Sequence, residues 1–133
     1  NSVGCERTFE EDSSNPTVLL TELYRLVLEL VERLKKKEFK GRTLTLKVKF
    51  YNFTQITRSR TVPHMLLKKD DILPVAKALL REVDYTERPV RLLGVQVSNI
   101  DDTPHLPQWI QLELPFKKES SFEELKELKE LRS

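Results

Sequence analysis

A β-hairpin predicted within residues 42–61 is the feature that most constrains the fold of this chain. Apolar and polar residues alternate over 44–50, which is the period of a strand that buries one face. The polar positions of that strand are Thr45, Lys47 and Lys49. Asn52 suits a turn, and 55–61 follows as a β-branched but strongly polar segment. The pattern predicts a sheet with one face on a core and the other in solvent or against a polar partner.

Two amphipathic helices are predicted to cover the apolar face of this hairpin. The first spans about 15–36, where an asparagine cap is followed by Pro16 and apolar residues recur at spacings of three and four. The second begins at the pair Asp70 and Asp71, with Pro74 still in its first turn. Both helices therefore have one apolar stripe available to pack on the sheet.

Two further strands, at about 3–9 and 89–99, complete the pattern. The order strand, helix, strand, strand, helix, strand is the split βαβ arrangement. We therefore predict an α+β domain at 1–100, with a four-stranded antiparallel sheet and two helices on one face (βαββαβ). The other face of the sheet is left free, and it carries the polar side of the hairpin.

Residues 101–133 are predicted to form a C-terminal tail with a short helix. The tail contains a short apolar peptide, QLELPF, at 111–116. Ser121 followed by Glu124 is a capping box, which begins the final helix. The peptide either docks on a partner or stays with this chain, as a strand on the edge of its sheet or packed on the final helix, and the pattern leaves both open.

Composition narrows the class of protein. The 133 residues fit one domain, and no apolar run approaches the roughly 18 residues that cross a membrane. No signal peptide is visible, so we expect no membrane partner. Cys5 is the single cysteine, which excludes an internal disulfide and fits a cytoplasmic setting. The chain starts at Asn1 rather than Met, which suggests a piece of a longer protein.

The charge of the chain is concentrated in one segment. The formal net charge is only +2, yet residues 35–69 hold eleven basic residues and one acidic residue. Such a segment is a plausible footprint for a polyanion such as nucleic acid. A solvated, lysine-rich surface explains the same charge, and charge alone does not separate the two.

Three blocks of sequence resemble a known family, in the right order along the chain. SVGCERTF at 2–9 resembles an SxGxExTF entry strand, YNFTQITRSRT at 51–61 resembles a YxxFxxxTRSxT hairpin, and RLLGVQVS at 91–98 resembles an RLLGVxxS last strand. These motifs are those of the little finger domain of Y-family DNA polymerases. The chain is most similar to the bacterial DNA polymerase IV branch of that family.

The resemblance implies a piece of a translesion DNA-directed DNA polymerase. In that family the domain lies along duplex primer–template DNA beside the catalytic core of the same polymerase. Catalysis there uses palm-domain carboxylates that hold Mg²⁺, so this fragment is expected to have no catalytic residues and no cofactor of its own. The peptide at 111–116 resembles the family's sliding-clamp peptide. The expected clamp-binding residues are Gln111, Leu112, Leu114 and Phe116.

The candidate DNA-binding residues lie on three of the predicted strands. They are Arg7, Thr8, Thr45, Lys47, Lys49, Thr57, Arg58, Ser59, Arg60 and Thr61. Arginine, lysine and hydroxyl groups bind phosphate oxygens, so we expect binding that is independent of sequence. We expect Arg7 to join the lysines on the free face. In the hairpin, Arg58 and Arg60 point to one side of a regular strand and the hydroxyl residues to the other. Either a twist or bulge brings both sets to DNA, or one set acts elsewhere.

Other chemistry has weaker support in the sequence. His64 and His105 are far apart and have no cysteine near them, so a metal site is not expected. Asp101 and Asp102 read as turn formers, and Cys5 as a small packed side chain. Two other functions remain open at this point: a free-standing RNA- or ribosome-binding module, and a small Mg²⁺-dependent nuclease built on the aspartate pair.

Overall fold

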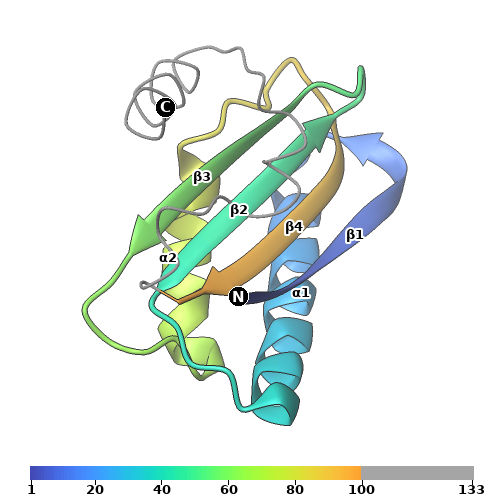
Figure 1. Cartoon of the computed structure of the whole chain (residues 1–133). Coiled ribbons are helices and arrows are strands. Elements are labelled where there is room, and N and C mark those ends of the chain that lie inside the picture. Colours follow the sequence, from blue (N-terminus) through green and yellow to red (C-terminus); the bar gives the residue numbers. More distant parts are fainter. Residues whose placement is uncertain (100–133) are drawn as a thin grey trace.

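The structure, a computed structural model, describes residues 1–99 and has two layers (Figure 1). The elements are β1 (Ser2–Ser13), α1 (Pro16–Lys37), β2 (Thr43–Phe50), β3 (Gln55–Thr61), α2 (Lys69–Arg81) and β4 (Val90–Ser98). All strand pairs are antiparallel, in the order β1-β4-β2-β3, and both helices lie on one face of the sheet. The predicted fold class is confirmed. The predicted tail, with the peptide at 111–116, lies outside the described residues.

The alternation in β2 builds the core. Its apolar residues face the helices and are fully buried: Leu44, Leu46, Val48 and Phe50. β2 pairs with β3 on one side and β4 on the other, so Leu46 has Arg58 and Val95 as its neighbours across the sheet. Because the side-chain period of a strand is two, the polar residues of β2 must point to the opposite face.

Helix α1 begins where its capping residues predict and ends one residue beyond the predicted end at about 36. The side chain of Asn15 accepts a hydrogen bond from the Thr17 N–H at 2.8 Å, and Pro16 takes the first helical position. At the other end Glu38 has a left-handed backbone (φ 51°), which stops the helix. Most of the apolar stripe predicted from the sequence is buried against the sheet: Leu19, Leu23, Leu26, Val27, Leu30 and Leu34. Leu20, which the spacing also placed in that stripe, is exposed instead.

Helix α2 begins one residue before the predicted aspartate pair. Lys69 is its first residue, and Asp71 reaches back to accept hydrogen bonds from the N–H groups of Lys68 (2.9 Å) and Leu67 (3.1 Å). The carboxylate therefore caps the helix from within its first turn. Because the helix starts at Lys69, Pro74 lies in its second turn and not, as predicted, in its first. The hydrogen bond from the Lys68 backbone lowers the pKa of Asp71 below its ordinary value of 3.8.

Replacing this cap tests its role in stability. We expect Asp71→Ala to lower the free energy of unfolding at pH 7 by about 1 kcal/mol, because two backbone N–H groups lose their acceptor. The folded-state pKa is lowered, so the contribution is present above pH 3.8 and is lost as pH falls through the lowered pKa. Urea titrations at neutral and acidic pH measure this, with Asp70→Ala as the matched control. An equal loss in both variants contradicts the assignment.

Strand β1 is longer than predicted. It runs to Ser13, and after a register shift beyond Thr8 its last pair is Ser13 with Val90. This extension places Asp12 against Arg91 of β4, with two contacts of 3.1 Å between carboxylate and guanidinium. Among residues 1–99, neither helix is long and apolar enough to cross a membrane.

Candidate nucleic-acid interface

The face of the sheet opposite the helices is polar, and we call it the polar face. The strand register defines its members, which come from all four strands. They are Ser2, Gly4, Glu6 and Thr8 of β1, Leu92, Gly94, Gln96 and Ser98 of β4, Thr43, Thr45, Lys47 and Lys49 of β2, and Gln55, Thr57, Ser59 and Thr61 of β3. One surface thus brings together all the predicted hydroxyl and lysine candidates.

Pairs of hydroxyl groups cross from β2 to β3 on the polar face. The Oγ1 atoms of Thr43 and Thr61 are 2.7 Å apart, and Thr45 Oγ1 is 2.7 Å from Ser59 Oγ. Each pair has two O–H groups and uses one of them in its mutual bond, so one donor per pair is left. Thr45 is buried and Ser59 is exposed, so Thr45 orients a hydroxyl that a partner can reach.

The two lysines of the polar face differ in their surroundings. Lys47 is buried (6% exposed), and its Nζ lies 3.0 Å from Glu6 Oε1 of β1. That ion pair spans β4 at Gly94, where an added Cβ would lie only 3.2 Å from the Cβ of Glu6. Glycine therefore leaves room for the lysine to reach across the sheet. Lys49 is half-buried, so it is the more accessible cation of this face.

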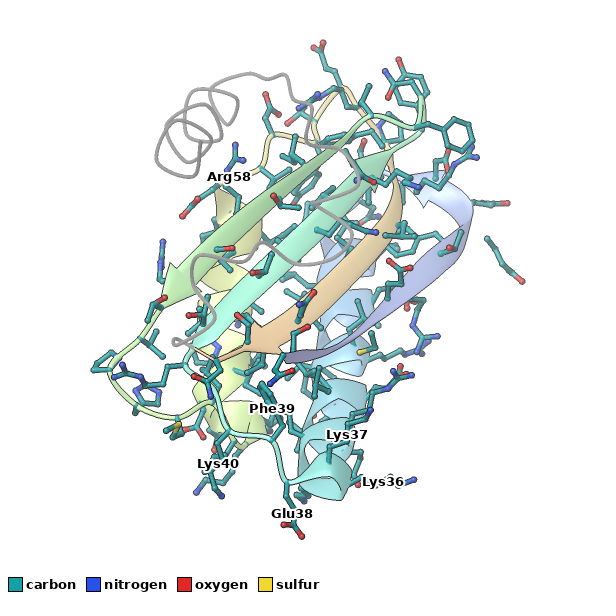
Figure 2. The ribbon with its side chains drawn as sticks, in the orientation of Figure 1. Lys36, Lys37, Glu38, Phe39, Lys40 and Arg58 are labelled. Atoms are coloured by element: carbon teal, nitrogen blue, oxygen red, sulfur yellow. The ribbon has the colours of Figure 1, made fainter. Side chains whose placement is uncertain are left out.

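Arg58 and Arg60 lie on the other side of β3. The register places them opposite the core residues Leu46 and Leu44, not with the hydroxyl residues. Arg60 Nη2 is 2.7 Å and Arg58 Nε is 3.7 Å from the carboxylate of Glu82, which follows α2. Figure 2 shows Arg58 at the β3 edge of the sheet. The structure thus decides which set shares the polar face: it is the hydroxyl residues, and the arginines tie the edge strand to the helix layer.

The expectation that Arg7 joins the free face is wrong. Arg7 alternates with residues of the polar face and lies on the helix side of β1, between Glu22 (3.3 Å) and Glu29 (3.7 Å) of α1. Its neighbours in β1 with the same orientation are the buried Val3 and Cys5. Thr8, the other candidate in this strand, is exposed on the polar face.

Seven of the eleven cations of the segment 35–69 gather at one end of the molecule, which we call the basic end. They are Lys35, Lys36, Lys37, Lys40, Arg42, Lys68 and Lys69. Figure 2 shows Lys36, Lys37 and Lys40 at the end of α1 and in the loop that follows it. The Leu66 N–H donates to the Gly41 carbonyl at 2.9 Å, which ties this loop to the one before α2. The eleven cations of the segment 35–69 thus fall into three groups: seven at the basic end, two lysines on the polar face, and two arginines paired with Glu82.

The metal and nucleophile candidates do not form a site within the described part of the chain. In residues 1–99 no group of three or more His, Cys, Asp and Glu side chains could hold a metal ion. His105 and the pair Asp101 and Asp102 lie outside the described residues. Cys5 is buried, with its Sγ 3.5 Å from the Leu26 carbonyl, and burial raises its pKa to about 12. It is the packed side chain that the sequence predicts.

The thiol of Cys5 should therefore be inert in the folded chain. We expect no reaction with a thiol-specific reagent at pH 8 in buffer, and rapid reaction in denaturant. The pKa is raised above the ordinary 9.0, so the stability that the neutral thiol contributes is complete below pH 9 and is lost as pH rises toward 12. Rapid labelling of the native chain, absent in Cys5→Ser, contradicts the burial.

Comparison with known proteins identifies the domain. Residues 1–114 match the impB/mucB/samB family C-terminal domain. The chain belongs to this family. It is 49% identical over 117 residues to DNA polymerase IV of Bacteroides fragilis (strain YCH46), covering 86% of this chain and 32% of that protein. It is 45% identical over 111 residues to DNA polymerase IV of Akkermansia muciniphila, covering 84% of this chain and 31% of the relative. The chain spans about a third of these relatives.

Solved structures agree with the family. A little finger domain of PolIV, in a complex with the beta-clamp processivity factor, matches with a TM-score of 0.63 and 30% identity, over 76% of this chain and 90% of that one. An insertion ternary complex of Dbh DNA polymerase matches with a TM-score of 0.62 over 75% of this chain and 28% of that one; at 23% identity it supports the fold alone. The identification as the little finger domain of a Y-family DNA polymerase is confirmed.

Sequence reasoning missed the partners of the charged candidates. Glu82 and Glu6, which hold Arg60 and Lys47, were not singled out, nor was the gathering of the basic end. One signal was available: Arg7 has the same parity as Val3 in β1, which indicates the helix side. No local signal identifies Glu82, because it meets β3 only after the chain has passed through α2.

Proposed function

We propose that this domain binds duplex primer–template DNA, independently of sequence, as part of a translesion DNA polymerase of the polymerase IV type. The observation that carries the proposal is the polar face: rows of hydroxyl groups and a lysine on the side of the sheet that the helices leave open. Support comes from the polymerase IV relatives and from the fold shared with a polymerase solved in an insertion ternary complex.

The accessible contacts lie along β3 and at the end of β2. Thr57, Ser59 and Thr61 offer O–H donors to phosphate oxygens, and Lys49 adds a charge-assisted contact. Thr8 extends the surface on β1. The buried Thr45 and Lys47 support these contacts from within the sheet. Thr45 orients the Ser59 hydroxyl, and Lys47 is bonded to Glu6. Contacts of this kind read the backbone and not the bases, as a polymerase requires.

The basic end supplies longer-range attraction. Its seven cations lie beside four acidic residues, Glu32, Glu38, Asp70 and Asp71, so positive charge is in excess there. Such a field draws a polyanion toward the domain and fades with added salt. In this proposal the basic end attracts and orients the duplex, while the polar face makes the short contacts.

Catalysis belongs to the catalytic core of the parent polymerase in this proposal. The described residues contain no cluster of carboxylates that fits a Mg²⁺ site, so we assign the metal expected in a polymerase to that core. In this proposal the domain binds the primer–template, and the catalytic core carries out the chemical step.

The salt dependence of DNA binding tests which side of β3 contacts the duplex. We expect Lys49→Ala to weaken binding to a blunt DNA duplex and to lower the slope of log affinity against log salt by about one, because one phosphate contact is lost. Arg58→Ala and Arg60→Ala are the matched controls: they break ion pairs to Glu82 on the other side of β3 and should leave the slope unchanged. Fluorescence anisotropy at several salt concentrations measures this.

The reverse pattern contradicts the proposed face. If the arginine variants lower the slope and Lys49→Ala does not, the duplex lies along the β3 edge on the helix side. A-form RNA serves as a second ligand for the unsubstituted chain. Tighter binding of RNA than of DNA favours the RNA-binding alternative.

We further propose that the peptide at 111–116 docks on the sliding clamp. The peptide has the composition of a docking segment, and the 30% identical little finger domain was solved with a beta-clamp processivity factor. Gln111 bonds a pocket rim, Leu112 and Leu114 enter a groove from one side, and Phe116 fills a deeper slot. The proline within the peptide lowers the entropy lost on binding.

The clamp proposal is tested by the double variant Leu114→Ala and Phe116→Ala. We expect at least tenfold weaker binding to a bacterial sliding clamp, measured by surface plasmon resonance, with an unchanged melting temperature and unchanged duplex binding. A drop in melting temperature with intact clamp binding means that these residues belong to the core of the domain, and the docking role is then wrong.

A further inference from the structure

The turn between β2 and β3 presents an aromatic side chain in a costly conformation. Phe53 is 64% exposed and has a left-handed backbone, with φ 70°. A bulky residue without a functional reason seldom takes this conformation, since asparagine or glycine adopts it more readily. Strain of this kind is a reason to look for a function, because it persists only where the surroundings impose it.

Hydrogen bonds within the turn impose the conformation. The Phe53 N–H donates to the Phe50 carbonyl at 2.8 Å, and the Phe50 N–H donates to the Thr54 carbonyl at 2.8 Å. The side chain of Asn52 accepts from both the N–H (3.2 Å) and the hydroxyl (2.7 Å) of Thr54. The position of the ring is thus set before any partner arrives.

A guanidinium group supports the ring. Arg91 of β4 lies 4.6 Å from the centroid of Phe53, a cation–π distance. Arg91 donates two hydrogen bonds of 3.1 Å to the Asp12 carboxylate, so Asp12 of β1 holds the guanidinium that supports the Phe53 ring. Most of the Phe53 surface nevertheless faces solvent, and Tyr51 beside it is 47% exposed.

The surroundings of the ring favour a nucleobase as its partner. The turn directly continues the polar face, because Lys49 and Gln55 are the last pair of the hairpin before it. It lies at the opposite end of the sheet from the basic end (Figures 1 and 2). A preset aromatic ring beside cations is the arrangement on which unpaired bases stack, and stacking is tolerant of sequence. Every primer–template supplies such bases in its single-stranded template.

We propose that Phe53, supported by Arg91, is a platform on which an unpaired template base stacks next to the duplex bound on the polar face. The platform rests on the proposed function and adds a second ligand class to it, single-stranded DNA at the junction. It distinguishes a primer–template from a blunt duplex, which hydroxyl and lysine contacts to phosphates do not.

The test compares two DNA ligands on the complete 133-residue chain. One is a blunt duplex, and the other is the same duplex with a short 5′ overhang that carries 2-aminopurine at its first unpaired position. We expect the overhang to raise affinity about fivefold or more, the lower end of what one stacked base contributes, and we expect the fluorescence of the probe to fall on binding. Phe53→Trp and Phe53→Tyr should retain both effects.

Two variants separate stacking from folding. Phe53→Ala should remove the gain from the overhang and leave blunt-duplex affinity unchanged. Phe53→Gly should do the same while keeping or raising the melting temperature, because glycine accepts φ 70° without strain. A purely structural role of the ring cannot give that combination.

The outcomes distinguish the two proposals. If the native chain binds the blunt duplex but gains nothing from the overhang, or if Phe53→Gly keeps the gain, the platform is wrong and the duplex proposal stands. If Phe53→Ala weakens both ligands equally, the ring contacts the duplex and the platform is again wrong. If the native chain binds neither ligand, the proposed function fails and the platform fails with it.

Discussion

The register of β2 between β3 and β4 is the constraint on which both the core and the candidate interface depend. Four apolar residues of β2 are fully buried under the helices, and four polar residues alternate with them on the other face. A slip of one residue in either pairing exchanges the two sets, since side chains in a strand alternate with period two. The same hydrogen bonds therefore define what is buried and what is available to a ligand.

Most of the fold could be predicted because its signals are local. Alternation marks β2, the Asn15 cap and Pro16 mark the start of α1, and the order of elements then limits the topology. The extension of β1 to Ser13 could not be predicted, because it depends on pairing with Val90, far along the chain. Helix α2 starts earlier than predicted for a different reason. Asp71 lies inside the helix, and its side chain caps the N–H groups of the residues just before it.

The candidate site was predicted in its residue types more than in its geometry. The lysines and hydroxyls of β2 and β3 do share one face, as their spacing indicates. The arginines attracted attention by their charge, yet strand parity places Arg58 and Arg60 with the core side, where Glu82 binds them. Ion pairs such as Lys47 with Glu6 join distant segments, and only the sheet order, with Gly94 between them, brings them together.

This distribution of charge determines how the polar face holds a duplex in the proposed DNA-binding role. A face crowded with unpaired arginines would bind tightly and release each phosphate slowly. Here the lysine at the centre of the polar face is bonded to Glu6, and hydroxyl pairs provide many of the donors around it. Hydroxyls exchange partners with water at little cost, because an uncharged bond contributes little net free energy. The excess charge lies instead at the basic end, where it attracts without fixing a register. In the proposed DNA-binding role, a domain built this way favours movement along a duplex over residence at one position, and the proposed Phe53 platform at the far end of the sheet marks the junction with the single-stranded template.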